Sequence, residues 1–164
     1  MELIQVALAI ATLLCSLVAG LVLGFAVVVM PGIKELNDHD YLQAFKVMDR
    51  VIQNNQPIFM IVWLGSAVAV IVLAGLSIWE LDGLNRTLAI VASAVYLIGV
   101  QLPTITINIP LNNRLQSLEL GSLTEKELHQ TRESFENRWV FWNSARTLVA
   151  TIVSVGLITL ALNI

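Results

Sequence analysis

Four long apolar runs alternate with shorter polar segments along the chain, and this pattern predicts four membrane-spanning helices. The expected spans are about 3–30, 58–79, 87–111 and 139–162. A hydrocarbon core of roughly 30 Å needs about 20 helical residues, and the runs lack the alternation of barrel strands. The first run has no positively charged start, so we expect it to remain attached rather than to act as a cleaved signal peptide.

The two long connections carry amphipathic helical patterns of their own. The first predicts a helix over about 38–54, for which Asn37 and Asp38 are the N-cap candidates. Its apolar residues recur at helical spacing: Tyr41, Phe45, Met48 and Ile52. The second predicts a helix over about 125–138, preceded by the capping-box pair Thr124 and Glu127. If this helix continues unbroken into the fourth span, it is roughly 57 Å long.

Composition supports a protein of the bilayer. Apolar residues make up 57% of the 164 residues and charged residues 13%, against about 25% charged in a typical soluble domain. The mean hydropathy is +0.79. The net charge of −3 and the lack of a basic block argue against nucleic acid as a partner. We therefore expect an all-α integral membrane four-helix bundle, a single membrane domain over 1–164, with two additional amphipathic segments on one face and lipid around it.

Positive charge is distributed unevenly between the two ends of the predicted bundle. Seven of the nine Lys and Arg residues lie in the two long connections. The positive-inside rule then places these connections in the cytoplasm and both termini outside. In the first span, Ser16, Gly20 and Gly24 recur at four-residue spacing. Small residues at this spacing favour close helix packing, either within the bundle or between copies in a homo-oligomer.

The third span carries the first unusual polar residues. Its polar side chains form one helical stripe, which consists of Gln101, Thr104, Asn108 and Asn112. Pro103 and Pro110 lie in the same stretch, and each removes a backbone donor. Irregular backbone at membrane depth is tolerated where it lines a cavity or is buried in protein. The stretch therefore indicates a cavity.

The fourth span contributes an arginine, Arg146, on the same face as Asn143. One interpretation is structural: Arg146 snorkels toward Trp139, and the amides join helices three and four. The other is a polar pocket in which Arg146 and Asn143 converge with Asn108 and Asn112, because an intramembrane ionisable residue is a functional hypothesis by default. Trp139 and Trp142 suit the interfacial belt. The candidate counter-ions of Arg146 are Asp49 and Glu136.

No conventional catalytic or metal-binding motif is present in the sequence. The only histidines are His39 and His129, one in each long connection. Glu133 is four residues from His129, which is weak support for a metal site, and we predict no metal. Neither a catalytic triad order nor a phosphate-binding glycine loop occurs. The sequence therefore leaves any cofactor unknown.

An ordered set of short motifs resembles a known family. The motifs are Met30-Pro-Gly-Ile33, the segment 49–59, Asn108-Ile-Pro-Leu-Asn112, Phe135-Glu-Asn-Arg-Trp139, Trp142-Asn143 and Arg146-Thr147. In order and spacing, and over nearly the whole chain, they look like the small four-helix membrane family that includes the anthrone oxygenases, catalogued as a domain of unknown function. Characterised relatives oxidise polyketide anthrones to anthraquinones with molecular oxygen. The family's recurrent residues map onto Asn108, Pro110, Asn112, Trp139, Trp142, Asn143 and Arg146.

The sequence supports two functions of different classes. The first is an enzyme that oxidises a flat phenolic or polyketide-like substrate with molecular oxygen. In it Arg146, Asn143 and Asn108 stabilise the developing enolate, and the remaining predicted contacts bind substrate: Asn112, Trp139, Trp142, Gln101 and Asp49. A proton acceptor remains open among Asp49, Glu136 and the histidines. The alternative is a non-catalytic membrane protein that binds a lipid or quinone, or docks a membrane partner. A transporter is a weaker third choice, because no inverted repeat is evident.

Overall fold

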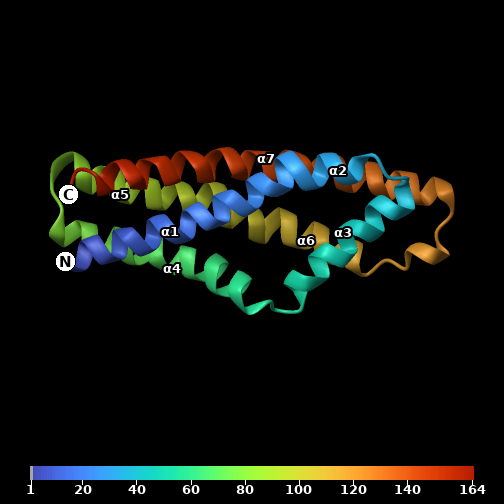
Figure 1. Ribbon diagram of the computed structural model, residues 1–164, viewed down its shortest axis with the longest axis horizontal. Coiled ribbons are helices and arrows are strands. Elements are labelled where there is room, and N and C mark those ends of the chain that lie inside the picture. The colour runs from blue at the N-terminus through green and yellow to red at the C-terminus, as the bar shows by residue number, and fades with distance from the viewer. Residues whose placement is uncertain (1) are drawn as a thin grey trace.

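The computed structural model describes residues 2–164, and this part of the chain contains helices and no strand (Figure 1). Four helices are long and apolar enough to cross a membrane: Leu3–Lys34, Pro57–Glu80, Gly83–Gln116 and Glu125–Ala161. The chain is thus an all-α, multi-pass membrane protein, as the sequence predicts. The second of these helices is α4 and the fourth is α7, which is capped by Thr124 and runs unbroken through the whole bundle.

The first and third long helices each contain π-helical turns. The first consists of α1 (Leu3–Gly24), the π turn η1 (Phe25–Val29) and α2 (Met30–Lys34). The third consists of α5 (Gly83–Tyr96), the π turns η2 (Leu97–Gln101) and η3 (Thr104–Asn108), and α6 (Ile109–Gln116). Only Leu81 and Asp82 separate α4 from α5, so these two helices are joined by a tight turn.

Every π turn ends two residues before a proline. The pairs are Val29 with Pro31, Gln101 with Pro103, and Asn108 with Pro110. A proline lacks an N–H and its ring crowds the carbonyl four residues back. Widening the preceding turn is one way in which a membrane helix accommodates this. Thr104 Oγ1 also donates to the Val100 carbonyl at 2.7 Å. The third helix therefore continues through both prolines rather than breaking.

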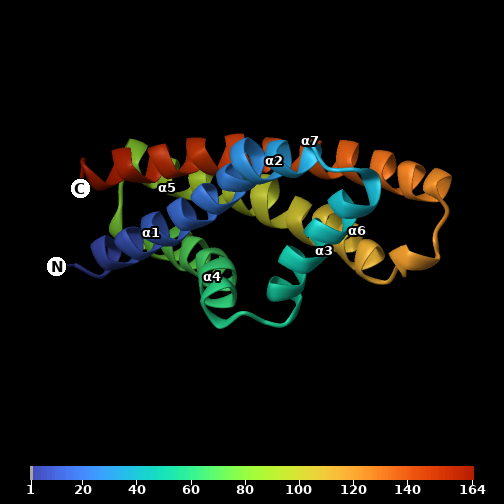
Figure 2. The same ribbon diagram turned by 45° about the vertical axis from the view of Figure 1, so that its right-hand side comes forward.

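The four long helices pack so that α1 and α5 each contact both α4 and α7. One apolar cluster fills the half of the bundle nearest the two termini, which lie at the same end (Figures 1 and 2). The buried side of α1 includes Ala11, Cys15 and Val18. The predicted seam of Ser16, Gly20 and Gly24 lies elsewhere: a Cβ built at Gly20 or Gly24 meets nothing within 4 Å. That seam does not pack within this chain.

The opposite end of the bundle is covered by α3 (Asp38–Gln53), which packs against α6 and α7 (Figure 2). The Asn37 side chain caps α3 by accepting from the Asp40 N–H at 2.9 Å, as predicted. Tyr41 and Phe45 of the predicted apolar stripe are buried in a second apolar cluster with Phe135 and Trp139. The first amphipathic helix therefore lies against the protein. The last short element is the 3₁₀ turn η4 (Leu120–Ser122) between α6 and α7.

Candidate functional site

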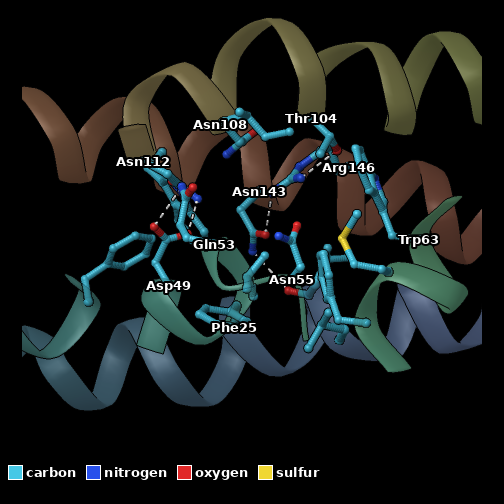
Figure 3. A pocket seen from close by; sticks show the side chains of 18 residues that line it. Phe25, Asp49, Gln53, Asn55, Trp63, Thr104, Asn108, Asn112, Asn143 and Arg146 are labelled. Carbon is cyan, nitrogen blue, oxygen red and sulfur yellow. Dashed lines mark hydrogen bonds between the residues drawn. The ribbon is translucent and has the colours of Figure 1, made fainter. Parts of the chain in front are cut away.

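A pocket of about 210 Å³ lies in the half of the bundle next to α3. Its walls come from α1, η1, α3, α4, η3, α6 and α7 (Figure 3). It reaches the surface at the corner between α3 and α4, where Gln53 and Asn55 are exposed. Asn55 has a φ of 56°, a left-handed conformation that asparagine tolerates better than most residues. The π turn η3 of the third long helix lines this pocket. The cavity therefore lies beside the stretch containing Pro103 and Pro110, from which the sequence predicted it.

Arg146 supplies a buried positive charge to the pocket, and its side chain is 6% exposed. Its Nη1 donates to Thr104 Oγ1 at 2.7 Å and its Nη2 donates to Asn143 Oδ1 at 3.0 Å. The Asn143 amide is held in turn, because its Nδ2 donates to the Val22 carbonyl at 3.0 Å. Within residues 2–164, Arg146 forms no ion pair and its Nε has no hydrogen-bond partner. Neutral oxygens alone therefore hold the guanidinium.

Unpartnered polar atoms lie beside Arg146. Asn108 is 2% exposed, and neither its Nδ2 nor its Oδ1 has a hydrogen-bond partner in the described chain. The buried Nε1 of Trp63, another lining residue, is also unpartnered. A buried unsatisfied donor or acceptor costs about 1–3 kcal/mol, so each such group needs an explanation. A ligand that accepts from Arg146, Asn108 and Trp63 and donates to Asn108 Oδ1 would satisfy all of them.

A buried carboxylate, Asp49 of α3, also lines the pocket (Figure 3). It is 3% exposed and accepts from three side-chain amides. The donors are Asn112 at 2.8 Å, Gln116 at 2.9 Å and Gln53 at 3.3 Å. The Asn112 amide is oriented by the Trp139 indole, which donates to its Oδ1 at 2.9 Å. This chain of bonds joins α7, α6 and α3 around the carboxylate.

Lys46 lies one turn before Asp49 on α3 and is also buried. Its Nζ donates to the Leu118 carbonyl, and its own carbonyl accepts from Gln116 Nε2 at 2.9 Å. Burial, and then repulsion from Arg50, lower the pKa of Lys46 from its ordinary value. Gln116 thereby binds Lys46 and Asp49 at once, which fixes the direction of its amide.

Aromatic rings form much of the remaining wall. The Trp139 ring lies 5.7 Å from Phe25 and 5.1 Å from Phe45, centroid to centroid. The rings of Phe59 and Trp63 stack at 6.3 Å on the α4 side. Planar apolar walls with a few fixed polar groups are typical of a site for a flat organic ligand.

Six of the eight predicted site residues line this one pocket: Arg146, Asn143, Asn108, Asn112, Trp139 and Asp49. Gln101 and Trp142 do not. The Gln101 side chain donates to the Trp63 carbonyl at 3.2 Å and to Ser66 Oγ at 3.1 Å, with the Tyr96 hydroxyl on the same Ser66. Trp142 lies outside the pocket, edge to face against Phe141.

The π turns explain the displacement of Gln101. A π turn bonds residue i to i+5, so it adds a residue to the turn and rotates the residues before the turn relative to those after it. The spacing rule that places Gln101 on the stripe of Asn108 assumes a regular α-helix. Trp142 lies outside the pocket for a simpler reason. Trp139, Asn143 and Arg146 share the inner face of α7 at i, i+4 and i+7, and Trp142 falls beside that face.

The proposed counter-ions do not pair with Arg146. Asp49 binds amides, and Glu136 pairs with Arg132 at 2.9 Å. The two histidines lie outside the pocket. His129 Nδ1 is 3.0 Å from Asp38 Oδ2, and His39 Nδ1 is 3.1 Å from Asp40 Oδ1. Among the described residues no group of three or more His, Cys, Asp or Glu side chains is placed to hold a metal ion.

Sequence reasoning missed two polar contributors. The first is Trp63, whose indole N–H lies on α4, a helix with few polar side chains before its terminal Glu80, chiefly Ser66 and Ser77. The available signal was the tryptophan itself, an indole donor in the interior of an apolar span. The second is Gln116, which binds Asp49. Gln116 lies four residues after Asn112, so the polar stripe of the third span extends one helical turn beyond the residues predicted for it.

Comparison with known proteins identifies the family. The sequence profile of the family described as anthrone oxygenase matches residues 45–156, which include every residue of the pocket from α3 onward. No curated protein and no solved structure matches the chain. The matched region covers well over half of the 164 residues. The chain belongs to the anthrone oxygenase family.

Proposed function

We propose that the protein is a membrane oxygenase that converts an anthrone-like, flat phenolic substrate into the corresponding quinone with molecular oxygen. The observation that carries this proposal is the unpaired, buried cation at one part of an aromatic pocket that also contains a buried carboxylate. Arg146, Asn108 and Trp63 present donors without partners, and Asp49 presents an acceptor. The family membership supports the same chemistry.

The pocket suits the size and shape of part of a polycyclic aromatic. Its volume of about 210 Å³ exceeds the roughly 150 Å³ of a cavity that holds benzene. The remaining part of a three-ring ligand would extend into the open mouth between α3 and α4, beside Phe59 and Met60. An apolar substrate dissolved in the bilayer would enter there, while its carbonyl oxygen turns to Arg146.

The reaction balances without further reactants. An anthrone has a CH₂ group opposite its carbonyl. Loss of one proton gives an enolate, which transfers an electron to O₂ and then combines with the resulting superoxide to form a C–O bond. The peroxide takes up a proton, after which loss of the second C–H proton and cleavage of the O–O bond give the new carbonyl and water. One O₂ is consumed and one water is released per quinone formed.

Arg146 is assigned to the developing enolate oxygen. A fixed cation and fixed donors are most effective in a water-poor site, where they require no reorganisation during the reaction. The Thr104 and Asn143 oxygens orient the guanidinium but leave its charge uncompensated. Asn108 supplies an additional amide donor.

Asp49 is assigned to the proton. A carboxylate has about four acceptor positions, and three are occupied by Asn112, Gln116 and Gln53. The remaining position is available to a substrate C–H or to the peroxide. Of the acceptors considered from sequence, Asp49 is the one that lines the pocket, whereas Glu136 and the histidines do not.

The test is oxygen uptake by the purified protein in lipid nanodiscs with a simple anthrone, measured above the spontaneous rate. We expect Arg146→Leu and Asp49→Asn each to lose roughly 100-fold or more of the protein-dependent rate, the size of effect seen when one stabilising donor or one general base is removed. Gln101→Leu is the matched control: it removes a buried polar side chain of the same region that lies outside the pocket, and it should retain the wild-type rate per folded molecule.

Binding must be measured in parallel. Quenching of the tryptophan fluorescence by an anthraquinone reports occupancy without turnover, because two of the four tryptophans, Trp63 and Trp139, line the pocket. Uptake lost in both pocket variants but not in Gln101→Leu supports the proposal. Quenching by wild type with no uptake above background would refute oxidation and establish a ligand-binding protein instead.

The proposal also includes the orientation in the membrane that the sequence predicts. With the long connections in the cytoplasm, the α3 end of the bundle faces inward and both termini face outward. Cysteine labelling of variants at Glu2 and Lys126 in intact cells tests this: a membrane-impermeant reagent should reach only the first.

A further inference from the structure

A second cavity lies between α6 and α7, at the α3 end of the bundle, and its volume is also about 210 Å³. It is separate from the pocket described above, with which it shares no lining residue. The lining residues on α7 lie on one face of that helix, at positions i, i+3, i+4 and i+7 from Thr131 to Arg138. The α6 side contains Arg114 and Leu115.

The cavity is strongly electropositive for its size. Arg114 and Arg138 both line it, and none of its lining residues is acidic. Neither arginine forms an ion pair within residues 2–164, whereas Arg86 and Arg132 each bind a carboxylate. The sequence explains this difference: the residues three and four positions before and after Arg114 and Arg138 include no Asp or Glu.

The floor of the cavity is apolar. Leu115 and Phe135, both buried in the cluster under α3, form its base, and the Thr131 hydroxyl lies on its wall. Two guanidinium groups beside a hydroxyl are suited to a phosphate, because arginine binds phosphate oxygens with two parallel hydrogen bonds. Leu111, which also lines the cavity one turn nearer the membrane-spanning part of the helix, is suited to the first carbons of an attached chain.

The position of the cavity along α7 agrees with a lipid headgroup. Arg138 is one helical turn before Trp142 and the exposed Phe141, aromatic side chains of the kind that gather at the membrane interface. Basic pockets between membrane helices on the cytoplasmic side are known to bind anionic headgroups.

We propose that the cavity between α6 and α7 binds a phosphate group, and that the phosphate is the headgroup of an anionic phospholipid. Arg114 and Arg138 hold the phosphate, Thr131 donates to it, and the glycerol and first acyl carbons rest on Leu111, one turn nearer the membrane on α6. A bound lipid would thereby join α6 to α7 behind the face of α6 that carries Asn112 and Gln116.

Native mass spectrometry of the delipidated protein tests the proposal by titration with dioleoyl phosphatidylglycerol, using dioleoyl phosphatidylcholine for comparison. We expect phosphatidylglycerol to bind more tightly. Each interfacial arginine contributes about fivefold, so the double variant Arg114→Gln, Arg138→Gln should bind it roughly 30-fold more weakly. Arg50→Gln is the matched control, because Arg50 is exposed on the neighbouring α3 and does not line the cavity.

The outcomes separate the explanations. An equal loss in Arg50→Gln, or equal affinity for the two lipids, would overturn the proposal and leave only diffuse charge attraction. The pair Arg114→Lys, Arg138→Lys keeps the charge and guards against misfolding: it should bind phosphatidylglycerol between wild type and the Gln pair. Inorganic phosphate at the same concentration should displace little lipid; full displacement would support a phosphate site but assign it to a free phosphate.

Discussion

The unpartnered amide of Asn108 leads to an unusual expectation, namely that removing a polar site residue stabilises the protein. In Asn108→Leu the two buried atoms that lack partners are replaced by methyl groups of similar reach. The new side chain faces the pocket, so it has room and does not overpack the core. The same substitution at Asn143 removes an amide that bonds Arg146 and the Val22 carbonyl.

The two substitutions should therefore differ in sign. Relieving the unsatisfied atoms of Asn108 is worth about 1–3 kcal/mol, which raises the melting midpoint by roughly 2–12 °C for a chain of this size. In Asn143→Leu the bond to the charged Arg146 is lost, about 1.5–3 kcal/mol, together with a neutral bond of about 0.5–1.5 kcal/mol. The midpoint should fall by roughly 4–18 °C.

The assay is thermal unfolding of both variants and wild type, without ligand, in one detergent. Ligand binding by fluorescence quenching is measured on the same samples. Asn108→Leu should melt higher but bind an anthraquinone at least tenfold more weakly, the stability–function exchange expected of a site residue. If Asn108→Leu instead melts lower by as much as Asn143→Leu, the Asn108 amide is already satisfied in the free protein, and the case for a ligand there is lost.

Three further substitutions test the packing and the helix ends. Gly99→Ala places a Cβ 2.7 Å from Val149 Cγ1 and should destabilise the bundle by about 1–3 kcal/mol; trimming Val149 to Ala in the same chain should restore most of it by thermal unfolding. Gly75→Ala meets nothing within 4 Å, and the same measurement should show it stabilising by about 0.5–1 kcal/mol. Thr124→Ala removes the cap of α7, which receives the Glu127 N–H at 3.4 Å; hydrogen exchange should rise in that first turn, for a loss of about 1 kcal/mol.

The fold was largely predictable because its strongest signals are local. Apolar runs longer than a bilayer is thick have few alternatives to a spanning helix. The caps at Asn37 and Thr124 each join the side chain of that residue to the backbone N–H three residues away, and both form as expected. The inner face of α7 was also predictable, since that helix is regular from end to end and Trp139, Asn143 and Arg146 keep their spacing.

The structure differs from the sequence-based expectations where a helix is irregular, or where a contact depends on residues far apart in sequence. Gln101 was assigned to the site because an α-helical period was assumed across two prolines, and the π turns changed that period. The pairing of Arg146 with Asp49 or Glu136 was expected from charge alone. Which partner a charge takes depends on how α3 lies over α6 and α7, and that placement is set by contacts between residues far apart in sequence.

The separation of Arg146 from Asp49 is itself the feature that best supports the proposed reaction. Two opposite charges in one water-poor pocket attract strongly, and a direct ion pair would neutralise both. Here each charge is instead held by fixed neutral dipoles: Thr104 and Asn143 hold the cation, and three amides hold the anion. Asn143 and Asn112 are each anchored by a second bond on the other side, so neither charge can move toward the other without breaking a hydrogen-bonded chain. The field between the charges is therefore preserved for a molecule that enters the pocket with an oxygen to present to Arg146 and a proton to give to Asp49.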